Sequence, residues 1–176
     1  NNIPLEKKNL KTIRKNIGYV FQDADSQLFM STVFDDVAFA PRNYGMSEAE
    51  VNEKTMEALK VVHIEQLKDK QIYKLSGGEK KLASIATILS TEPDVILMDE
   101  PSVALDPKNR RNLINILNQL NQAKIIASHD LNMIMDTCER TILLSDGKVI
   151  KDGNTKEILL DKELMEESGL ELPLGY

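Results

Sequence analysis

Three apolar runs that end in polar residues constrain the fold of this chain more than any other feature of its sequence. They are Ile17–Gln22, Val95–Met98 with Asp99-Glu100 directly after it, and Lys124–Ala127 with Ser128-His129-Asp130 after it. Short apolar runs indicate buried strands, and the second, which lacks alternation, is typical of a strand covered on both faces. Because helical stretches separate the runs, we predict an α/β fold in which a parallel sheet is flanked by helices.

Helical spacing fills much of the sequence between the first two runs. Ser47 and Glu50 have the spacing of a capping box, which predicts a helical segment from about 47 to 70. A second helix is expected directly after Gly77-Gly78, because apolar residues recur there with a helical period. That stripe is Leu82, Ile85, Ala86 and Leu89.

Local signals also predict the elements after the second run. Asp106-Pro107 is expected to begin a helix, with the aspartate as N-cap and the proline at the first helical position. Asp146-Gly147 between two apolar runs predicts a hairpin with a tight turn. Asn154 and Glu157 are expected to cap a further short helix.

Charge and composition exclude several classes of protein. The formal net charge of −6 and the pI near 5.1 argue against broad nucleic-acid binding, which relies on clustered Lys and Arg. No run of about 18 uninterrupted apolar residues occurs, and the amino end has neither the charged start nor the apolar core of a secretory signal. We therefore expect a chain that neither spans a membrane nor enters a secretory route by itself.

The single cysteine, Cys138, is expected to be a buried thiol and not a nucleophile. One cysteine cannot form an internal disulfide, which fits a reducing cytosolic compartment. Cys138 follows Leu131, Ile134 and Met135 at the spacing of a buried helical stripe, and buried thiols behave as small hydrophobes.

Two motifs carry residues suited to phosphate and metal. Leu75-Ser76-Gly77-Gly78-Glu79 places unhindered amides at the positive end of a helix, a geometry that binds anions, although a Ser-Gly-Gly tripeptide taken alone is more often a plain loop before a helix. Asp99-Glu100 follows a buried strand. There the first carboxylate is suited to a metal-bound phosphate and the second to orienting and deprotonating water. Taken alone, the two acids could equally close a strand in solvent.

Two further polar residues stand at the ends of expected strands. Gln22 begins a polar loop after the first run, and His129 follows the third run, where an imidazole can hydrogen-bond a terminal phosphate oxygen. A lone histidine at a strand end is usually structural, and His63, inside the helical segment, is assigned to that class. All these motifs stand in one order, each at the end of an expected element. Their combination favours a functional role over a purely structural one.

In this order the motifs resemble those of the nucleotide-binding subunits of ABC transporters, over nearly the whole chain. The matching residues are Gln22 (Q-loop), Leu75–Glu79 (signature motif), Val95–Asp99 (Walker B), Glu100 (catalytic glutamate), Ser102–Asp106 (D-loop) and His129 (switch histidine). The resemblance implies a P-loop NTPase-like fold with a helical subdomain, and an ATPase that uses ATP and Mg²⁺.

The resemblance also implies roles in hydrolysis for four residues. Glu100 would act as general base, and Asp99 would hold magnesium through water. Gln22 would complete the metal and water shell, and His129 would stabilise the γ-phosphate.

Nucleotide contacts are implied for the signature motif and the D-loop. Ser76-Gly77-Gly78, with Glu79 beside them, would contact ATP held by the P-loop of a second subunit, and Asp106 of the D-loop would bind nucleotide as well. Glu79 stands where glutamine is commoner, a mild departure that should not abolish phosphate recognition.

The stretch from Phe21 to Pro41 narrows the resemblance to the ATPase subunits of energy-coupling factor transporters, which import vitamins or cobalt and nickel ions. This implies integral membrane subunits and a second ATPase subunit, in a homodimer or a heterodimer, as partners. It also implies a location at the cytoplasmic face of the cell membrane. Residues around 26 to 70 are the expected docking surface, and no nucleic-acid partner is expected.

One motif of the family does not occur in the sequence. There is no Gly-x-x-x-x-Gly-Lys-Ser/Thr, so the amides and the lysine that cradle phosphate are missing, as is the aromatic residue that stacks on adenine. We therefore expect a truncated ATPase domain that does not hydrolyse ATP alone. The resemblance places the P-loop strand inside the sheet, and its loss predicts instability or pairing with another chain.

We expect one partial domain over residues 1–176, with a helical and signature subdomain at about 26–90, catalytic strands at about 91–153 and a helical tail at about 154–176. Two other functions stay open. A soluble ABC ATPase that acts on DNA ends or ribosomes shares the signature and Walker B motifs. A P-loop-less module could offer its signature motif to a competent partner or regulate assembly.

Overall fold

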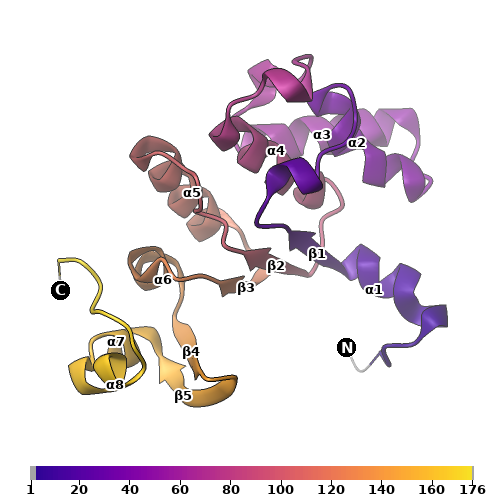
Figure 1. Cartoon of the computed structure of the whole chain (residues 1–176). Helices are drawn as coiled ribbons and strands as arrows, with labels where there is room; N and C mark the ends of the chain where they lie inside the picture. The colour runs from indigo at the N-terminus through magenta and orange to yellow at the C-terminus, as the bar shows by residue number, and fades with distance from the viewer. Residues whose placement is uncertain (1–2, 176) are drawn as a thin grey trace. The chain divides into compact units, whose positions relative to one another are not determined.

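A computed structural model describes residues 3–175 of the chain and confirms the α/β fold. The chain divides into two compact units, Asn1–Ala127 and Ser128–Tyr176. Each unit has its own sheet, which Figure 1 shows together with the helices. The finer division of the domain that the sequence suggests stays a prediction.

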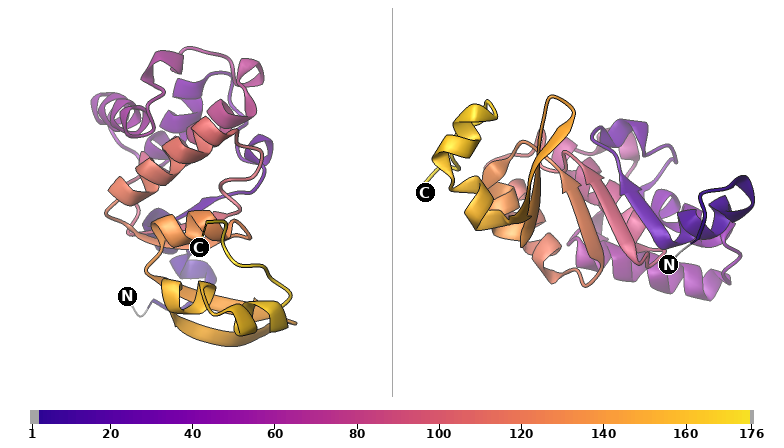
Figure 2. Two further views of the ribbon diagram at one scale, coloured as in Figure 1. Left: turned by 90° about the vertical axis from the view of Figure 1, so that its left-hand side faces the viewer. Right: turned by 90° about the horizontal axis from the view of Figure 1, so that it is seen from below.

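The first unit is built on a three-stranded parallel sheet in the order β1-β2-β3. The strands are β1 (Ile17–Val20), β2 (Val95–Asp99) and β3 (Ala123–Ala127). Figure 2 shows them side by side, with β2 in the middle. Among the described residues β3 pairs with β2 alone, so one of its edges has no strand partner there.

One face of this sheet is buried and the other is partly open. Ile96 and Met98 of β2 are buried, and they lie in register with Gly18 and Val20 of β1. The opposite face is formed by Ile17, Tyr19, Val95, Leu97 and Ile125, all of them partly or largely exposed. The prediction that Val95–Met98 is covered on both faces is therefore wrong for this structure, because helix packing covers only one face.

A glycine allows the helix that covers this face to approach closely. A Cβ built on Gly18 would lie 1.9 Å from Ile88 Cγ2 of α4 (Gly77–Leu89). No real Cβ atom tolerates such a distance, so a side chain at this position would force Ile88 or the helix that carries it to shift. The close approach seats α4, which carries the signature motif, directly on β1.

Two of the remaining described helices of the first unit, α3 (Glu48–Val61) and α5 (Pro107–Gln119), begin where local signals in the sequence predicted a helix. The others are α1 (Leu10–Asn16) and α2 (Val33–Asn43), with short 3₁₀ turns η1 (Lys7–Asn9), η2 (Ala24–Ser26), η3 (Glu65–Leu67) and η4 (Ile72–Lys74). Helices α2, α3 and α4 pack against one another. The expected capping box at Ser47 and Glu50 is present, and Asp106 caps α5 with Pro107 in its first turn.

The helical segment predicted from 47 to 70 is shorter than expected. The α-helix ends at Val61, and His63, which was placed inside it, has a φ of 58° in the left-handed region. Such a residue ends a helix, because continued helix needs negative φ. Only the single turn η3 follows.

The second unit contains a hairpin and three short helices. They are α6 (Leu131–Thr137), β4 (Arg140–Ser145), β5 (Lys148–Asn154), α7 (Thr155–Leu159) and α8 (Lys162–Glu167). Asp146 and Gly147 have φ values of 49° and 71°, as the predicted primed turn requires. Asn154 caps α7 as expected.

The prediction for Cys138 needs correction. It lies one residue beyond the end of α6, in extended backbone with a φ of −121°, and it is only half-buried. The helical spacing that suggested a buried stripe therefore breaks before the thiol.

Candidate functional site

The carboxyl ends of β1 and β2 bring two groups of predicted site residues to one edge of the sheet. Val20 lies opposite Met98, so the loop that begins with Phe21-Gln22 and the residues after Asp99 leave the sheet at adjacent points. In open parallel sheets, ligands bind outside the carboxyl ends of the strands. Lys81 connects these groups, because its ammonium bonds to the Gln22 carbonyl while the Asp99 carboxylate attracts its charge.

The signature motif forms the amino end of α4. Ser76 is the N-cap, and its Oγ accepts a hydrogen bond from the Glu79 amide at 3.3 Å. Within residues 3–175 no group accepts from the amides of Gly77 and Gly78. Two free amides at a helix amino end suit an anion such as phosphate. A Cβ on Gly77 would meet open space, so this chain itself leaves room for a close ligand.

The carboxylate of Glu79 turns back toward Ser76, the N-cap residue of α4. Its Oε2 accepts from the Ser76 amide at 2.7 Å and lies 3.0 Å from Lys70 Nζ. The Ser76 amide, and to a smaller extent Lys70, hold the pKa of Glu79 below its ordinary value. Lys70 thus balances the charge of the carboxylate, which is compatible with a glutamate beside the predicted phosphate-binding motif.

This arrangement predicts a pH-dependent contribution to stability. A lowered folded-state pKa means that ionised Glu79 stabilises the fold above its ordinary pKa of 4.5, and this stability is lost as pH falls through the lowered value. Glu79→Gln is expected to cost less than about 1 kcal/mol at pH 7. The cost should shrink toward zero between about pH 5 and pH 3. Denaturant unfolding at several pH values checks this, with Glu53→Gln on the exposed side of α3 as control. A pH-independent difference would contradict the ion-pair account.

The D-loop aspartate is held close to the signature motif. Asp106 accepts from the amides of Lys108 and Asn109, and its other oxygen accepts from Asn109 Nδ2 at 2.6 Å. A Cβ built on Gly78 would lie 2.6 Å from the same Nδ2, so a side chain at this position would require the Asn109 side chain to move. Asn109 therefore joins two predicted nucleotide-binding segments.

The backbone after Asp99 is strained. Glu100 and Ala104 have φ values of 43° and 62°, a region that non-glycine residues rarely adopt. The Glu100 amide donates to the Ala127 carbonyl at 2.9 Å, which fixes the start of this turn. Such strain of about 1–3 kcal/mol per residue is concentrated at functional sites.

His129 belongs to the second unit and follows β3 by two residues. Its side chain is exposed, and its carbonyl accepts from the Leu131 amide at 3.1 Å. The next residue, Asp130, caps α6 through the Met133 amide. The role of His129 at the γ-phosphate stays a prediction.

Two of the residues that hold the loop after β1 on α4 escaped prediction. Lys81, on α4, and Gln27, in the loop after β1, both hold that loop on the helix. Lys81 is four residues before Ile85, on the buried helical stripe, and a lysine in such a stripe is a signal that can be read from sequence. No comparable signal marks Gln27.

The residues present fit Mg²⁺ and ATP in their donor chemistry. Asp99 and Gln22 offer hard oxygen donors of the kind magnesium prefers, and the free amides of Gly77 and Gly78 suit phosphate. No cluster of three or more His, Cys, Asp or Glu that could hold a metal ion occurs in residues 3–175. Magnesium in ATPases is usually bound by one or two carboxylates, with phosphates and water as the other ligands. No helix in this described range is long and apolar enough to cross a bilayer.

Comparison with known proteins identifies the family. The family model for ABC transporters matches residues 1–103, more than half of the chain. This chain belongs to the ABC transporter ATPase family. An ABC transporter ATP-binding protein of Geobacter sulfurreducens is 48% identical to this chain. The match covers 98% of this chain and 69% of the relative. The energy-coupling factor transporter ATP-binding protein EcfA of Carboxydothermus hydrogenoformans is 40% identical over 97% of this chain and 64% of the relative.

A solved structure supports the same assignment for the ABC ATPase. CbiO1 of Clostridium perfringens, part of the ABC transporter complex CbiONQ, superposes with a TM-score of 0.83 at 37% identity. The match covers 94% of this chain and 67% of CbiO1. The chain therefore belongs to the ATPase subunits of ABC transporters and has the fold that the motifs predicted.

Proposed function

We propose that this chain belongs to a subunit that hydrolyses Mg-ATP to drive import of a metal ion or a vitamin. The observation that carries the proposal is the position of Gln22 and Asp99 at the carboxyl ends of the neighbouring strands β1 and β2, with Lys81 of the signature helix α4 bonded to the Gln22 carbonyl. The relatives named EcfA and the CbiO1 structure support an importer of the energy-coupling factor type.

Each site residue has one role in this proposal. When bound, magnesium supplies a charge that neutralises the phosphates. Asp99 would hold that ion through water, and Gln22 would orient the attacking water. Glu100 accepts the proton of this water, and His129 donates a hydrogen bond to a γ-phosphate oxygen.

The signature motif serves a nucleotide bound on a second subunit. Ser76, Gly77 and Gly78 donate hydrogen bonds to its phosphates. Asn109, which packs against Gly78 and donates to Asp106, holds the D-loop beside this motif. The P-loop for such a dimer comes from residues other than those of this sequence, so this chain alone is proposed not to hydrolyse ATP. In the experiments below, the term full-length subunit means this chain joined at its amino end to a P-loop segment. That segment is either its own or one taken from a homologous ABC ATPase.

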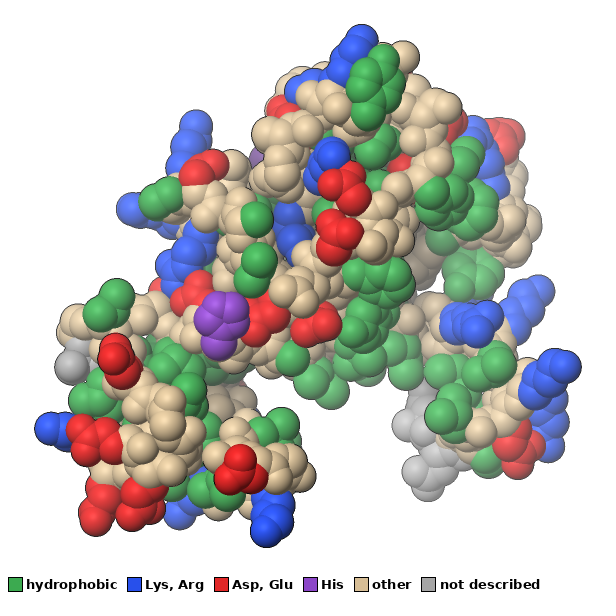
Figure 3. Space-filling model, in the orientation of Figure 1, with side chains coloured by type: hydrophobic (Ala, Val, Ile, Leu, Met, Phe, Trp, Pro, Cys, Tyr) green, Lys and Arg blue, Asp and Glu red, His purple; other side chains and the backbone are tan. Residues whose placement is uncertain are grey.

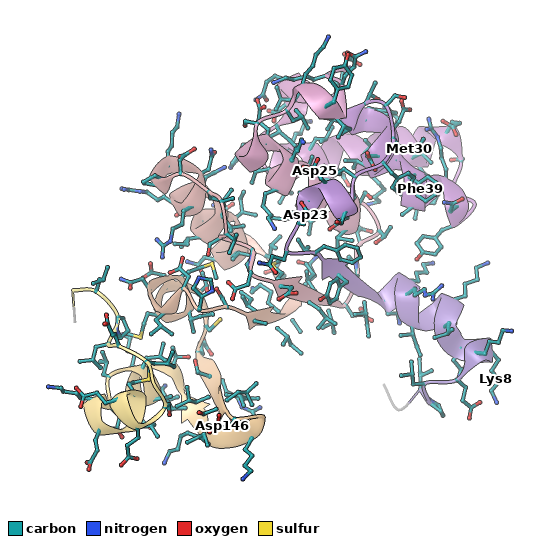
Figure 4. All side chains as sticks on the ribbon, in the orientation of Figure 1. Lys8, Asp23, Asp25, Met30, Phe39 and Asp146 are labelled. Atoms are coloured by element: carbon teal, nitrogen blue, oxygen red, sulfur yellow. The ribbon has the colours of Figure 1, made fainter. Side chains whose placement is uncertain are left out.

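An exposed aromatic pair is the proposed contact for the membrane subunit. Phe29 and Phe39 are 64% and 40% exposed, and their rings meet edge to face with centroids 4.8 Å apart. Buried Asp36 accepts from the amides of Phe29 and Met30, which fixes the loop that carries the pair. Figure 4 labels Met30 and Phe39 in this part of the chain, and Figure 3 shows apolar side chains reaching its surface.

Replacing both aromatics tests the transporter function. Phe29→Ser with Phe39→Ser in the full-length subunit is expected to weaken copurification with integral membrane subunits at least about tenfold, because aromatic anchors dominate interfaces. ATP binding should not change. Leu174→Ser, which alters an 82% exposed leucine elsewhere, is the control. Unchanged copurification by the double variant would contradict the docking surface. If the wild type never copurifies with membrane proteins but binds nucleic acid or ribosomes, the soluble class is supported instead.

A further inference from the structure

Lys81 is a buried lysine whose charge faces the loop after β1. The residue is 3% exposed, and its Nζ donates to the carbonyl oxygens of Phe21 at 3.0 Å and Gln22 at 2.7 Å. Burial lowers the pKa of Lys81, while the carboxylates of Asp23 and Asp99 oppose that shift. Two of these four residues, Gln22 and Asp99, have roles in the proposed reaction.

The two bonded carbonyls belong to the peptide groups on either side of the Gln22 Cα. Because each peptide group is planar, the only soft rotations between them are the φ and ψ of Gln22. Holding both groups therefore fixes these two angles and, with them, the direction in which the Gln22 side chain leaves the backbone. A single bond to one carbonyl would leave one rotation free.

Further contacts attach the same loop to α4. Lys80 Nζ lies 2.5 Å from Asp25 Oδ1, and Gln27 Nε2 donates to the Ser84 carbonyl at 2.8 Å. Gln27 Oε1 also accepts from the Phe21 amide at 3.0 Å. The labels of Asp23 and Asp25 in Figure 4 mark this loop. Lys81 is the member of the set that holds the Gln22 backbone itself.

A buried ammonium destabilises a fold relative to an apolar side chain of the same volume, unless its charge is compensated. Burying a charge costs several kcal/mol unless partners compensate it, and apolar residues of similar volume often give equal or greater stability. Methionine would fill the same volume on the buried stripe of α4. The lysine is therefore explained by its hydrogen bonds to the loop and not by packing.

We propose that Lys81 is a positioning residue that sets the orientation of Gln22 relative to the signature helix, an inference that rests on the proposed ATPase function. In this arrangement the glutamine is held ready for the metal and water shell before nucleotide binds. Any movement of α4 would move Gln22 with it, because both peptide groups are attached to the helix.

The test compares Lys81→Met, Lys81→Arg and the control Lys60→Met in the full-length subunit. Lys60 is an exposed lysine near the end of α3. Lys81→Met is expected to lower kcat about 10- to 100-fold, the usual effect of losing a residue that orients a ligand. The KM for ATP should stay within about threefold, because Lys81 acts through Gln22 in this proposal and is not assigned a nucleotide contact. Lys81→Arg, which keeps charged donors, should recover part of kcat.

Hydrogen exchange gives a second readout that needs no turnover. Amides of residues 21–27 are expected to exchange faster in Lys81→Met, while those in the middle of α4 stay protected. Native kcat in Lys81→Met would overturn the inference, and so would a loss of kcat with an unchanged loop. If Lys81→Met does not fold, Lys81→Arg decides, since native kcat with a fully unprotected loop would also overturn it. A wild-type subunit without ATP turnover would instead refute the proposed function.

Discussion

Glu100→Gln in the full-length subunit is expected to lower the rate of ATP hydrolysis about 10³-fold, within the 10²- to 10⁴-fold range of general acid–base catalysis. Glutamine has nearly the shape of glutamate but cannot accept the proton of the attacking water. The amide of residue 100 still donates to the Ala127 carbonyl, so the strained turn should persist. ATP should consequently accumulate in a closed dimer.

Phosphate release and gel filtration with Mg-ATP measure both consequences of this substitution. The wild type should turn over and elute mainly as monomer or open dimer, and Glu100→Gln should elute as a stable ATP-bound dimer. Glu163→Gln, on exposed α8, is the matched control. If Glu100→Gln turned over ATP at the native rate, Glu100 would not be the general base.

Local rules predicted much of the fold because they depend on neighbours in sequence. The capping box at Ser47, the N-cap at Asp106 and the turn at Asp146-Gly147 all involve residues within four positions of one another. The parallel sheet followed from three apolar runs separated by helices.

Errors arose where contacts between distant segments or local strain decide the outcome. His63 has a left-handed backbone conformation, which the presence of a histidine does not predict. The coverage of β2 depends on which helices pack against which face, and Gly18 shows that α4 takes one face. A run of apolar residues cannot reveal this.

The candidate site was predicted by residue type but not by its supporting contacts. The roles of Gln22, Asp99 and Glu100 came from motif resemblance, and they stay proposals. The bonds from Lys81 to the loop join residues about 60 positions apart, so sequence spacing gives no hint of them. The pairing of Glu79 with Lys70 is likewise visible only in the fold.

The second prediction with a large expected effect is that this chain alone binds Mg-ATP weakly, because it has no P-loop. In P-loop ATPases the loop amides and lysine supply most phosphate contacts, and none of this motif occurs in the sequence. Hydrogen bonds to charged groups contribute about 1.5–3 kcal/mol each, so losing two or more lowers affinity about 10²- to 10⁴-fold. This chain alone should therefore bind Mg-ATP more weakly than about 1 mM.

Calorimetric titration of Mg-ATP into this chain and into the full-length subunit tests the central claim most directly. We predict no saturable heat for the chain alone below about 1 mM ATP. The full-length subunit should show saturable binding in the micromolar to sub-millimolar range typical of enzymes. Saturable micromolar binding by the chain alone would mean that other residues build the nucleotide site. A full-length subunit that binds no Mg-ATP would contradict its assignment as the ATPase of a transporter.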